Sequence, residues 1–434
     1  MDLTQQPPRR PSNISMGGIV GLARMTDKAR GHNAELIGEY KFGRDSGLDV
    51  DVLGFIGMSD EEFADLVDEM SDDELASLVR EKSGHGDAEI EQFNRSWLER
   101  EPKDDLHRQL LVERVAKYAS GSTDITTVLR SMELDDWGMF RHRDLTQGPP
   151  RTPYFRSVAG VAAVARLSDK ARAKKADKLG EYKYGSDSRL DLQLLEFLKI
   201  SDEEFLELAY RNPNDKELSA EIAARRSFST GEIAAFNARI ATRGLNTPEL
   251  SERFRSRREE ICPERVDIEN FFDLIDYDDE RSFGLVDLNR RAPRSPYDRR
   301  ISGVTGLARM IDKGRAHNSG TLGAYWYGED SGFDRRILEF LGLTQEEFAA
   351  ALEECSGDAE IVSWMGERLT SKTAEEISSF CDTLCSLAPT NDKQKQFIEG
   401  IVLRLDSQRS DIDTFMAMTA LDDKVTFARL RALY

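Results

Sequence analysis

The clearest group of residues that could do chemistry is a set of basic residues around one aspartate. Asp27 lies three residues from both Arg24 and Arg30. On a helix its carboxylate is therefore expected between two guanidinium groups, with Lys28 on the neighbouring edge. Such a group could orient basic side chains toward a bound carboxylate or phosphate. The more common alternative is an ion-pair network that fixes the helix against its neighbours. The cluster recurs as Arg166, Asp169, Lys170 and Arg172, and as Arg309, Asp312, Lys313 and Arg315.

A second group follows the basic cluster and centres on Tyr40, Asp45 and Asp49. The segment from Gly43 to Ser46 is typical of a turn, in which Asp45 or Ser46 caps a helix that begins near Asp49. The functional alternative pairs Asp45 with Asp49 as a cation or acid–base site. Calcium and magnesium sites need more oxygen ligands than two carboxylates supply, so we predict no metal and no cofactor. The counterparts of Tyr40 and Asp49 are Tyr182 and Asp191, and Tyr325 and Asp334.

Two histidines stand at matching places just after the basic cluster. His32 and His317 each follow the last arginine of their cluster by two residues, whereas the middle copy has Lys174 there. A histidine at this place could exchange protons near neutral pH. Its absence from the middle copy favours a structural or solvent-exposed role. The sequence shows no nucleophile elbow, Walker loop or dinucleotide-binding glycine motif, so whether the protein is an enzyme stays open.

The sequence contains three copies of one repeat unit. GLARMTDKAR at 21–30 returns as AVARLSDKAR at 163–172 and as GLARMIDKGR at 306–315. Each copy opens with a Pro-Arg-x-Pro element, and Asp135-Asp136 also has a counterpart in every copy. The spacing is too long for a solenoid repeat and is the size of a domain. We therefore predict three tandem homologous domains, at residues 1–146, 147–289 and 290–434.

Each unit reads as all-helical. Leu22, Met25 and Ala29 form an apolar stripe at helical spacing, with charges on the other face. Capping-box pairs mark the starts of later helices. They are Ser59 with Glu62, Ser71 with Glu74, Ser201 with Glu204, Asn214 with Glu217, Ser229 with Glu232, Thr344 with Glu347 and Thr373 with Glu376. We expect an all-α fold with about six or seven helices in each domain.

Several motifs, taken together, resemble a bacterial family known as domain of unknown function 5069. They are PRSPY at 293–297, GLARMIDK at 306–313, Phe333-Asp334, FLG at 340–342, EIAAFNARIATRG at 232–244 and FFDLIDYDDER at 271–281. The resemblance implies an all-α unit and a soluble bacterial protein, and it implies no activity. The copies also differ among themselves: Ala324 replaces the glutamate of the other two, and Arg189 replaces their glycine.

Composition narrows the class of protein and its partners. The 434 residues carry a formal net charge of −20 and are 39% hydrophobic, which excludes a disordered chain. This charge argues against nucleic acid and anionic membranes as main partners. No apolar stretch approaches a membrane span, and the start of the chain lacks a secretion-signal pattern. We expect a cytoplasmic protein whose four cysteines, Cys262, Cys355, Cys381 and Cys385, are reduced.

Two functions follow from these observations. We favour a binding or interaction protein, such as a scaffold or assembly subunit, because three related domains give three related surfaces. The alternative is an enzyme or sensor for a small anion, with its site on the basic helix of the first and third copies. The expected partner is a protein or a small anionic ligand, and the oligomeric state is left open. A ligand site predicts a pocket where the basic helix faces the following turn, whereas a scaffold predicts charges that saturate one another.

Overall fold

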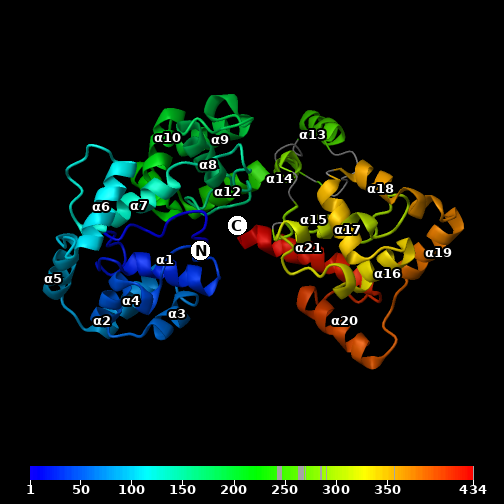
Figure 1. The fold of residues 1–434 in the computed structure, drawn as a ribbon, viewed down its shortest axis with the longest axis horizontal. Helices are drawn as coiled ribbons and strands as arrows, with labels where there is room; N and C mark the ends of the chain where they lie inside the picture. The colour runs from blue at the N-terminus through cyan, green and yellow to red at the C-terminus, as the bar shows by residue number, and fades with distance from the viewer. Residues whose placement is uncertain are drawn as a thin grey trace. The chain divides into compact units, whose positions relative to one another are not determined.

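The computed structural model describes residues 1–241, 247–261, 268, 270–283, 286–289, 291–355 and 357–433. In this part of the chain all regular secondary structure is helical, which confirms the all-α prediction (Figure 1). The described residues of each repeat contain seven α-helices and one short 3-10 helix, within the predicted number. None of the described helices has the length and the apolar content needed to cross a membrane.

The helices follow the same order in every repeat. The first repeat contains α1 (Leu22–Asn33), η1 (Gly43–Asp45), α2 (Gly47–Ile56), α3 (Asp60–Val67), α4 (Asp72–Ser83), α5 (Asp87–Leu98), α6 (Asp105–Tyr118) and α7 (Val128–Phe140). The second contains α8 (Val164–Lys175), η2 (Gly185–Asp187), α9 (Arg189–Leu198), α10 (Asp202–Arg211), α11 (Asp215–Arg225), α12 (Thr230–Ala241), α13 (Pro248–Ile261) and α14 (Phe271–Ser282). The third contains α15 (Leu307–Asn318), η3 (Gly328–Asp330), α16 (Gly332–Leu341), α17 (Gln345–Glu354), α18 (Asp358–Thr370), α19 (Ala374–Cys385), α20 (Asp392–Leu405) and α21 (Phe415–Leu433).

The contacts between residues divide the chain into two compact units. The first combines Met1–Arg151 with Phe155–Ala235, and the second combines Thr152–Tyr154 with Phe236–Tyr434. The first repeat therefore shares a compact unit with more than half of the second repeat. The boundaries 1–146, 147–289 and 290–434 stay a prediction from the sequence repeat.

The first helix of each repeat lies in the middle of its core. Nine of the twelve residues of α1 are buried, and they include Arg24, Asp27 and Lys28. The sequence pattern placed the charges opposite the apolar stripe and left their exposure open, and the structure buries these three. Core side chains from other segments cluster with those of the helix: Ile19, Val52, Phe63 and Leu75 with Met25 of α1 in the first repeat, matched by Val304, Ile337, Phe348 and Ile361 with Met310 of α15 in the third.

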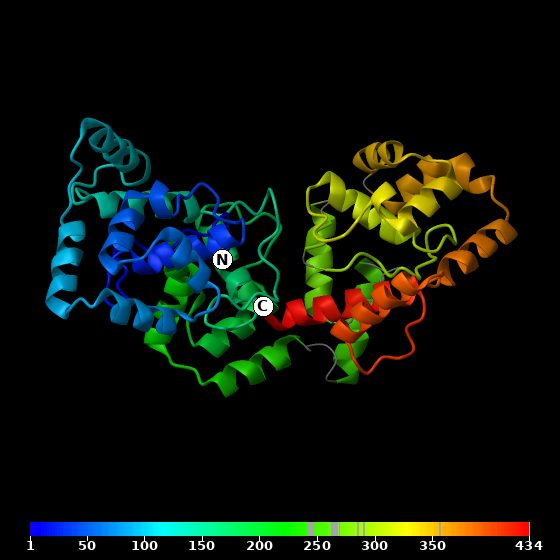
Figure 2. The ribbon, with the colours of Figure 1, turned by 90° about the horizontal axis from the view of Figure 1, so that it is seen from below.

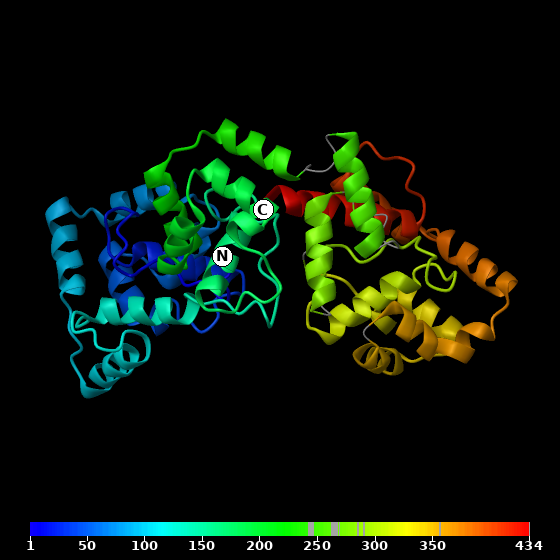
Figure 3. The same ribbon diagram turned by 90° about the horizontal axis from the view of Figure 1, so that it is seen from above.

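Most local signals at helix starts were read correctly. Two predicted capping boxes are formed in one direction only: Ser201 and Asn214 cap their helices, but the carboxylates of Glu204 and Glu217 bind Arg225 and Arg10 instead. Ser59, Ser71, Thr344 and Thr373 each form a capping box with the predicted glutamate. Asn214 caps α11 by accepting from the backbone N–H of Lys216 at 3.0 Å. In the second compact unit, α20 packs along α21 (Figures 2 and 3), with apolar side chains from both helices in one cluster.

Candidate functional site

The predicted aspartate of the basic cluster binds an arginine from the Pro-Arg-x-Pro element. Asp27 accepts three hydrogen bonds from Arg9: from the backbone N–H and Nε at 2.9 Å each, and from Nη2 at 2.8 Å. The helical spacing predicted that Asp27 lies between Arg24 and Arg30, and this was wrong. The reason is that those two side chains leave the helix toward other carboxylates. Arg151 with Asp169 and Arg294 with Asp312 repeat the arrangement.

The last arginine of the cluster binds a carboxylate at the start of a later helix. Arg30 and Arg9 both donate to Asp72, the first residue of α4. In the third repeat Arg315 and Arg294 converge in the same way on Asp358. The second repeat differs, because Arg172 binds Asp169 with 2.7 Å between Nη2 and Oδ1. Here the predicted contact between cluster arginine and aspartate is present. Burial lowers the pKa of Arg172 to about 10.

The first arginine of the cluster binds an aspartate of the last helix in its repeat. Arg24 Nη1 lies 2.5 Å from Oδ2 of Asp136, and Tyr40 donates its hydroxyl to the other oxygen at 2.9 Å. The guanidinium group also stands 5.4 Å from the centre of the Tyr40 ring. Arg309, Asp423 and Tyr325 repeat this triad, and Arg166 keeps the contact with the ring of Tyr182.

The ammonium group of the cluster lysine has three acceptors within the protein. Lys28 Nζ lies 2.7 Å from Asp49 Oδ1, 2.9 Å from the Lys41 carbonyl and 3.1 Å from Ser46 Oγ. Burial outweighs the neighbouring carboxylate and lowers the pKa of Lys28 to about 8. Asp49 thus serves as the partner of Lys28 instead of pairing with Asp45 around a cation. Lys170 with Asp191 and Lys313 with Asp334 form the same pair.

A glycine holds the turn that faces this lysine. The Gly43 N–H donates to Asp49 Oδ2 at 3.1 Å. Its φ of 65° is in the left-handed region, and an added Cβ would lie 2.6 Å from the Cβ of Asp60. Both facts require glycine here. The predicted turn is therefore correct, and Ser46 caps α2, as one of the two sequence alternatives proposed.

The two matching histidines lie at the surface and stack on an aromatic ring. His32 is exposed, with its ring centre 5.5 Å from that of Phe42. His317 is also exposed and lies 5.1 Å from Tyr327. Lys174 takes the same place over the ring of Tyr184. A cation or an imidazole therefore covers one aromatic position in all three repeats, in agreement with the solvent-exposed role favoured by the sequence.

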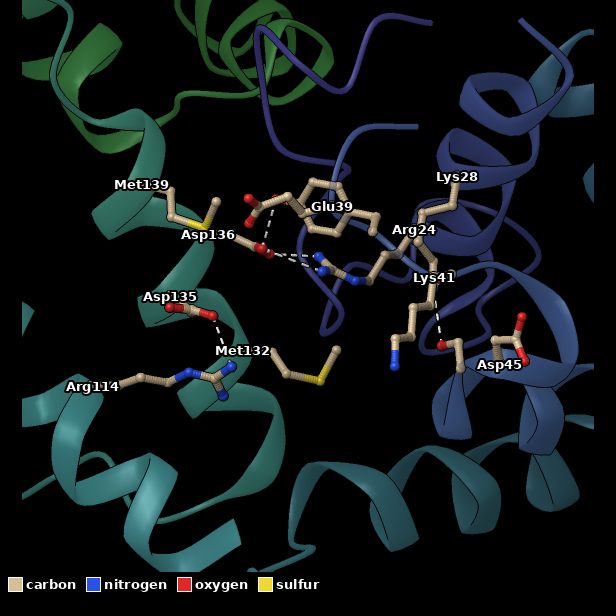
Figure 4. A pocket seen from close by; sticks show the side chains of 12 residues that line it. Arg24, Lys28, Glu39, Lys41, Asp45, Arg114, Met132, Asp135, Asp136 and Met139 are labelled. Atoms are coloured by element: carbon tan, nitrogen blue, oxygen red, sulfur yellow. Dashed lines mark hydrogen bonds and ion pairs between the residues drawn. The ribbon is translucent and has the colours of Figure 1, made fainter. Parts of the chain in front are cut away.

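A pocket opens beside the cluster in the first repeat (Figure 4). Its volume is about 320 Å³, and it lies between the Tyr40–Ser46 turn and helices α6 and α7. Its lining is Arg24, Lys28, Glu39, Tyr40, Lys41, Asp45, Ser46, Arg114, Met132, Asp135, Asp136 and Met139. The first repeat therefore combines both sequence expectations: the cluster charges saturate one another, and a pocket faces the basic helix.

A second pocket adjoins the first. Its volume is about 540 Å³, and four residues line both pockets: Lys41, Ser46, Arg114 and Met132. In Figure 4 the Lys41 ammonium and the Arg114 guanidinium lie on either side of Met132. Arg114 is held by Asp135, with 2.7 Å between Nη2 and Oδ2. Lys41 is exposed and forms no ion pair with any residue that the structure describes.

Sequence reasoning missed the carboxylates and arginines that complete the cluster, although their signal was present. Arg9 stands in the Pro-Arg-x-Pro element, and Asp136 in the repeated Asp-Asp pair. Asp72 follows Ser71 in a predicted capping box. All three recur in every copy, as Arg151, Asp215 and Asp279, and as Arg294, Asp358 and Asp423. Recurrence across the copies was therefore a sufficient signal for them.

The remaining expectations concern metals and cysteines. No group of three or more potential metal ligands occurs among the residues that the structure describes. Cys355, Cys381 and Cys385 are free thiols, and Cys262 lies outside the described residues. The repeat position at Asp267, which matches Asp124 and Asp411, also lies outside them.

Fold and site together define an all-α protein of three tandem repeats, each organised around buried ion pairs on its first helix. A comparison with models of protein families matches the domain of unknown function DUF5069 three times, over residues 5–137, 147–281 and 290–425. The chain therefore belongs to this family, in three tandem copies, as the resemblance indicated. A comparison with curated proteins gives no match.

Proposed function

We propose that this protein binds a small organic anion in the first repeat. The repeated ion-pair cluster then has a positioning role, because it fixes the helix and the turn that form one wall of the site. The observation that carries the proposal is the chemistry of the four residues shared by the two pockets. Lys41 and Arg114 are cations, Ser46 supplies a hydroxyl and Met132 a thioether. The junction of the pockets thus has two positive charges and no carboxylate.

The buried cluster supports this assignment. Arg24, 3% exposed, lines the first pocket, and its Nε has no hydrogen-bond partner in the described part of the chain. Two of the carboxylates that line the first pocket are paired, Asp135 with Arg114 and Asp136 with Arg24. Glu39 and Asp45 line it without an ion pair to any described residue. Lys41 keeps its charge for a ligand, and charge-assisted hydrogen bonds from lysine and arginine are the strong contacts for a carboxylate.

The test is a thermal-shift titration of the full chain with inorganic phosphate and a panel of small carboxylates. Ligand at 100 times its dissociation constant stabilises the folded state by about 2.7 kcal/mol. We expect Lys41→Ala to abolish the shift. Lys183→Ala is a matched control, because Lys183 occupies the same position in the second repeat and its carbonyl also accepts from a buried lysine. A shift that persists in Lys41→Ala, or the absence of any shift with these anions, overturns the proposal.

A second candidate is an interaction protein, and one observation favours it. The sixth helices of the first and third repeats expose large apolar side chains: Leu106 and Val112 on α6, and Phe397 and Leu403 on α20. Scattered exposed residues are common, but matching helices in two repeats are a specific pattern. Sedimentation of the wild-type chain and of Phe397→Ser with Leu403→Ser tests it, with self-association of the wild type alone as the expected result. The cytoplasmic location and the exclusion of nucleic acid stay predictions from composition.

A further inference from the structure

We infer that the anion is a carboxylic acid with an apolar body, whose carboxylate lies at the junction of the two pockets and whose body fills the second. This inference rests on the proposed function and adds the class of ligand to it. The second pocket, about 540 Å³, is large enough for an aromatic ring or a short alkyl chain. Its lining includes Leu48, Trp97, Leu110 and Val128.

The apolar wall of the second pocket is formed by side chains of four helices of the first repeat, α2, α5, α6 and α7. Leu48 and Trp97 are core residues, 3% and 4% exposed, and Leu110 lies on α6. Arg100 covers the Trp97 ring, with its guanidinium carbon 3.5 Å from the ring centre, and is held by Asp51. A fixed aromatic ring and two leucines give a ligand body contacts that a hydrated inorganic ion does not use.

An orphaned donor belongs to the same wall. The Nε1–H of Trp97 is buried and has no hydrogen-bond partner among the residues that the structure describes. An unpaired buried donor is costly, and buried tryptophan usually finds an acceptor. In the first pocket, Arg24 Nε is a second donor without a partner. Both donor atoms are buried, so the carboxylate of the ligand is assigned to Lys41 and Arg114, and the Trp97 ring supplies apolar contact.

The charges around the junction favour a single negative charge. Glu39 and Asp45 line the first pocket, and Glu101 and Asp104 line the second. Two further cations line the second pocket, Lys103 and Arg100, and Arg100 is paired with Asp51. Inorganic phosphate carries about −1.5 to −2 at neutral pH, so these carboxylates repel its second charge. A monocarboxylate brings one charge to the two cations of the junction. The ligand class is thus a monocarboxylate in preference to phosphate.

The third repeat differs at the junction in a way that confines the site. The positions of Lys41 and Arg114 are occupied there by Trp326 and Ile401. Trp326 is 73% exposed. Neither side chain carries a charge, so the third repeat is not expected to bind the same ligand by the same contacts. The second repeat keeps both cations by position, as Lys183 and Arg257, so the difference excludes the third repeat alone.

The experiment is isothermal titration of the full chain with acetate, butanoate, hexanoate, 3-phenylpropanoate and inorganic phosphate. We expect affinity to rise about fourfold per buried methylene from acetate to hexanoate, with phosphate weakest. Leu110→Ser should weaken hexanoate and leave acetate unchanged. Leu106→Ser is the matched control, because Leu106 lies on the same helix and is not part of the pocket lining.

The outcomes separate the two proposals. Equal affinity for acetate, phosphate and hexanoate, all lost in Lys41→Ala, leaves the anion site standing and overturns the ligand class. An equal effect of Leu106→Ser and Leu110→Ser on hexanoate also overturns it, because the second pocket is then not the place of the body. No binding of any of the five anions overturns both.

Discussion

Lys216 Nζ lies 2.8 Å from Asp72 Oδ2, an ion pair that joins the second repeat to the first within one compact unit. Asp72 also receives hydrogen bonds from Arg9 and Arg30. Burial by itself would raise its pKa, but the hydrogen bond from Lys216 and the charge of Arg9 outweigh that effect and hold the pKa of Asp72 well below its ordinary value. One carboxylate thus completes the cluster of the first repeat and attaches α11 to it.

The first prediction is an acid-sensitive contribution of this carboxylate to stability. Because the pKa of Asp72 is depressed in the folded state, its contribution is fully present above the ordinary value of 3.8 and is lost as the pH falls toward the folded pKa. Asp72→Asn should lower the free energy of unfolding at pH 7 by about 2 to 3 kcal/mol and flatten its dependence on pH below 4. Urea unfolding at pH 7 and pH 3 measures both effects.

The neighbouring Asp73 supplies the control for this prediction. Asp73 is exposed, lies beside Asp72 in the first turn of α4 and has no ion pair with any residue in the described part of the chain. Asp73→Asn should change neither the unfolding midpoint at pH 7 nor the acid dependence. An equal loss of stability in both variants would mean that negative charge at the start of α4 explains the effect. The ion pairs of Asp72 would then not explain it.

The second prediction concerns the arginine that the sequence analysis overlooked. Arg9 is 4% exposed and binds Asp27 through its backbone and its side chain. Its removal leaves the buried carboxylate of Asp27 with only the longer contact to Lys216, with 3.5 Å between Nζ and Oδ1, so Arg9→Ala should cost about 3 to 5 kcal/mol. Arg9→Lys should restore little, because an ammonium group does not reproduce the bidentate contact. Denaturant midpoints of the two variants measure this.

Arg44 gives the contrast for the second prediction. Its guanidinium group binds Asp60 and Glu61 at the surface, with 70% of the side chain exposed. Exposed ion pairs contribute little to stability, so Arg44→Ala should leave the midpoint nearly unchanged. A midpoint for Arg9→Ala close to that of Arg44→Ala would show that the buried pair adds no net stability.

Sequence reasoning succeeded where the determining interactions are local. Capping boxes, the turn before α2 and the helical period all depend on residues within a few positions of one another, and the structure has them. The cluster partners are not local. Asp27 is three positions from Arg24 but pairs with Arg9, which is 18 positions away, and Arg24 pairs with Asp136, which is 112 positions away. Helical spacing brings two residues to one side of a helix, but tertiary packing decides which carboxylate each guanidinium meets.

The lining of the pocket could not be predicted from local sequence patterns for the same reason. Lys41 comes from the turn before α2 and Arg114 from α6, and the two reach one cavity because α7 places α6 beside that turn. In its ligand-site alternative, the sequence predicted a pocket where the basic helix of the third repeat faces the turn from Tyr325 to Asp334, and the structure has a pocket at the equivalent place in the first repeat. The sequence pattern selected the residues of the basic helix, whose charges are paired within the protein. It did not select Lys41, whose ammonium group has no ion-pair partner among the described residues.

The third prediction compares two tyrosines at the same position of their repeats, of which one has a hydrogen-bonded hydroxyl and the other does not. Tyr184 donates its hydroxyl to the Asp202 carbonyl at 2.8 Å, whereas the buried hydroxyl of Tyr327 has no partner in the described part of the chain. The first repeat has Phe42 at this position. Tyr327→Phe removes an unsatisfied group and should stabilise by about 1 kcal/mol, and Tyr184→Phe removes a hydrogen bond and should destabilise by about 1 kcal/mol. Effects of the same sign in urea unfolding would contradict the assignment.

The last prediction follows from how two equivalent helices are anchored. No residue of α6 is buried, whereas its counterpart α20 buries Ile398, Val402 and Leu405. Local opening of a helix costs less when it exposes little apolar surface, so backbone amides of α6 should exchange with solvent faster than those of α20. Because α6 contributes Leu110 and Arg114 to the proposed site, a saturating carboxylate should slow exchange in α6 and leave α20 unchanged. Hydrogen exchange read by mass spectrometry compares both helices in one sample. Equal slowing in the two helices would indicate global stabilisation, and no slowing in α6 would place the ligand elsewhere.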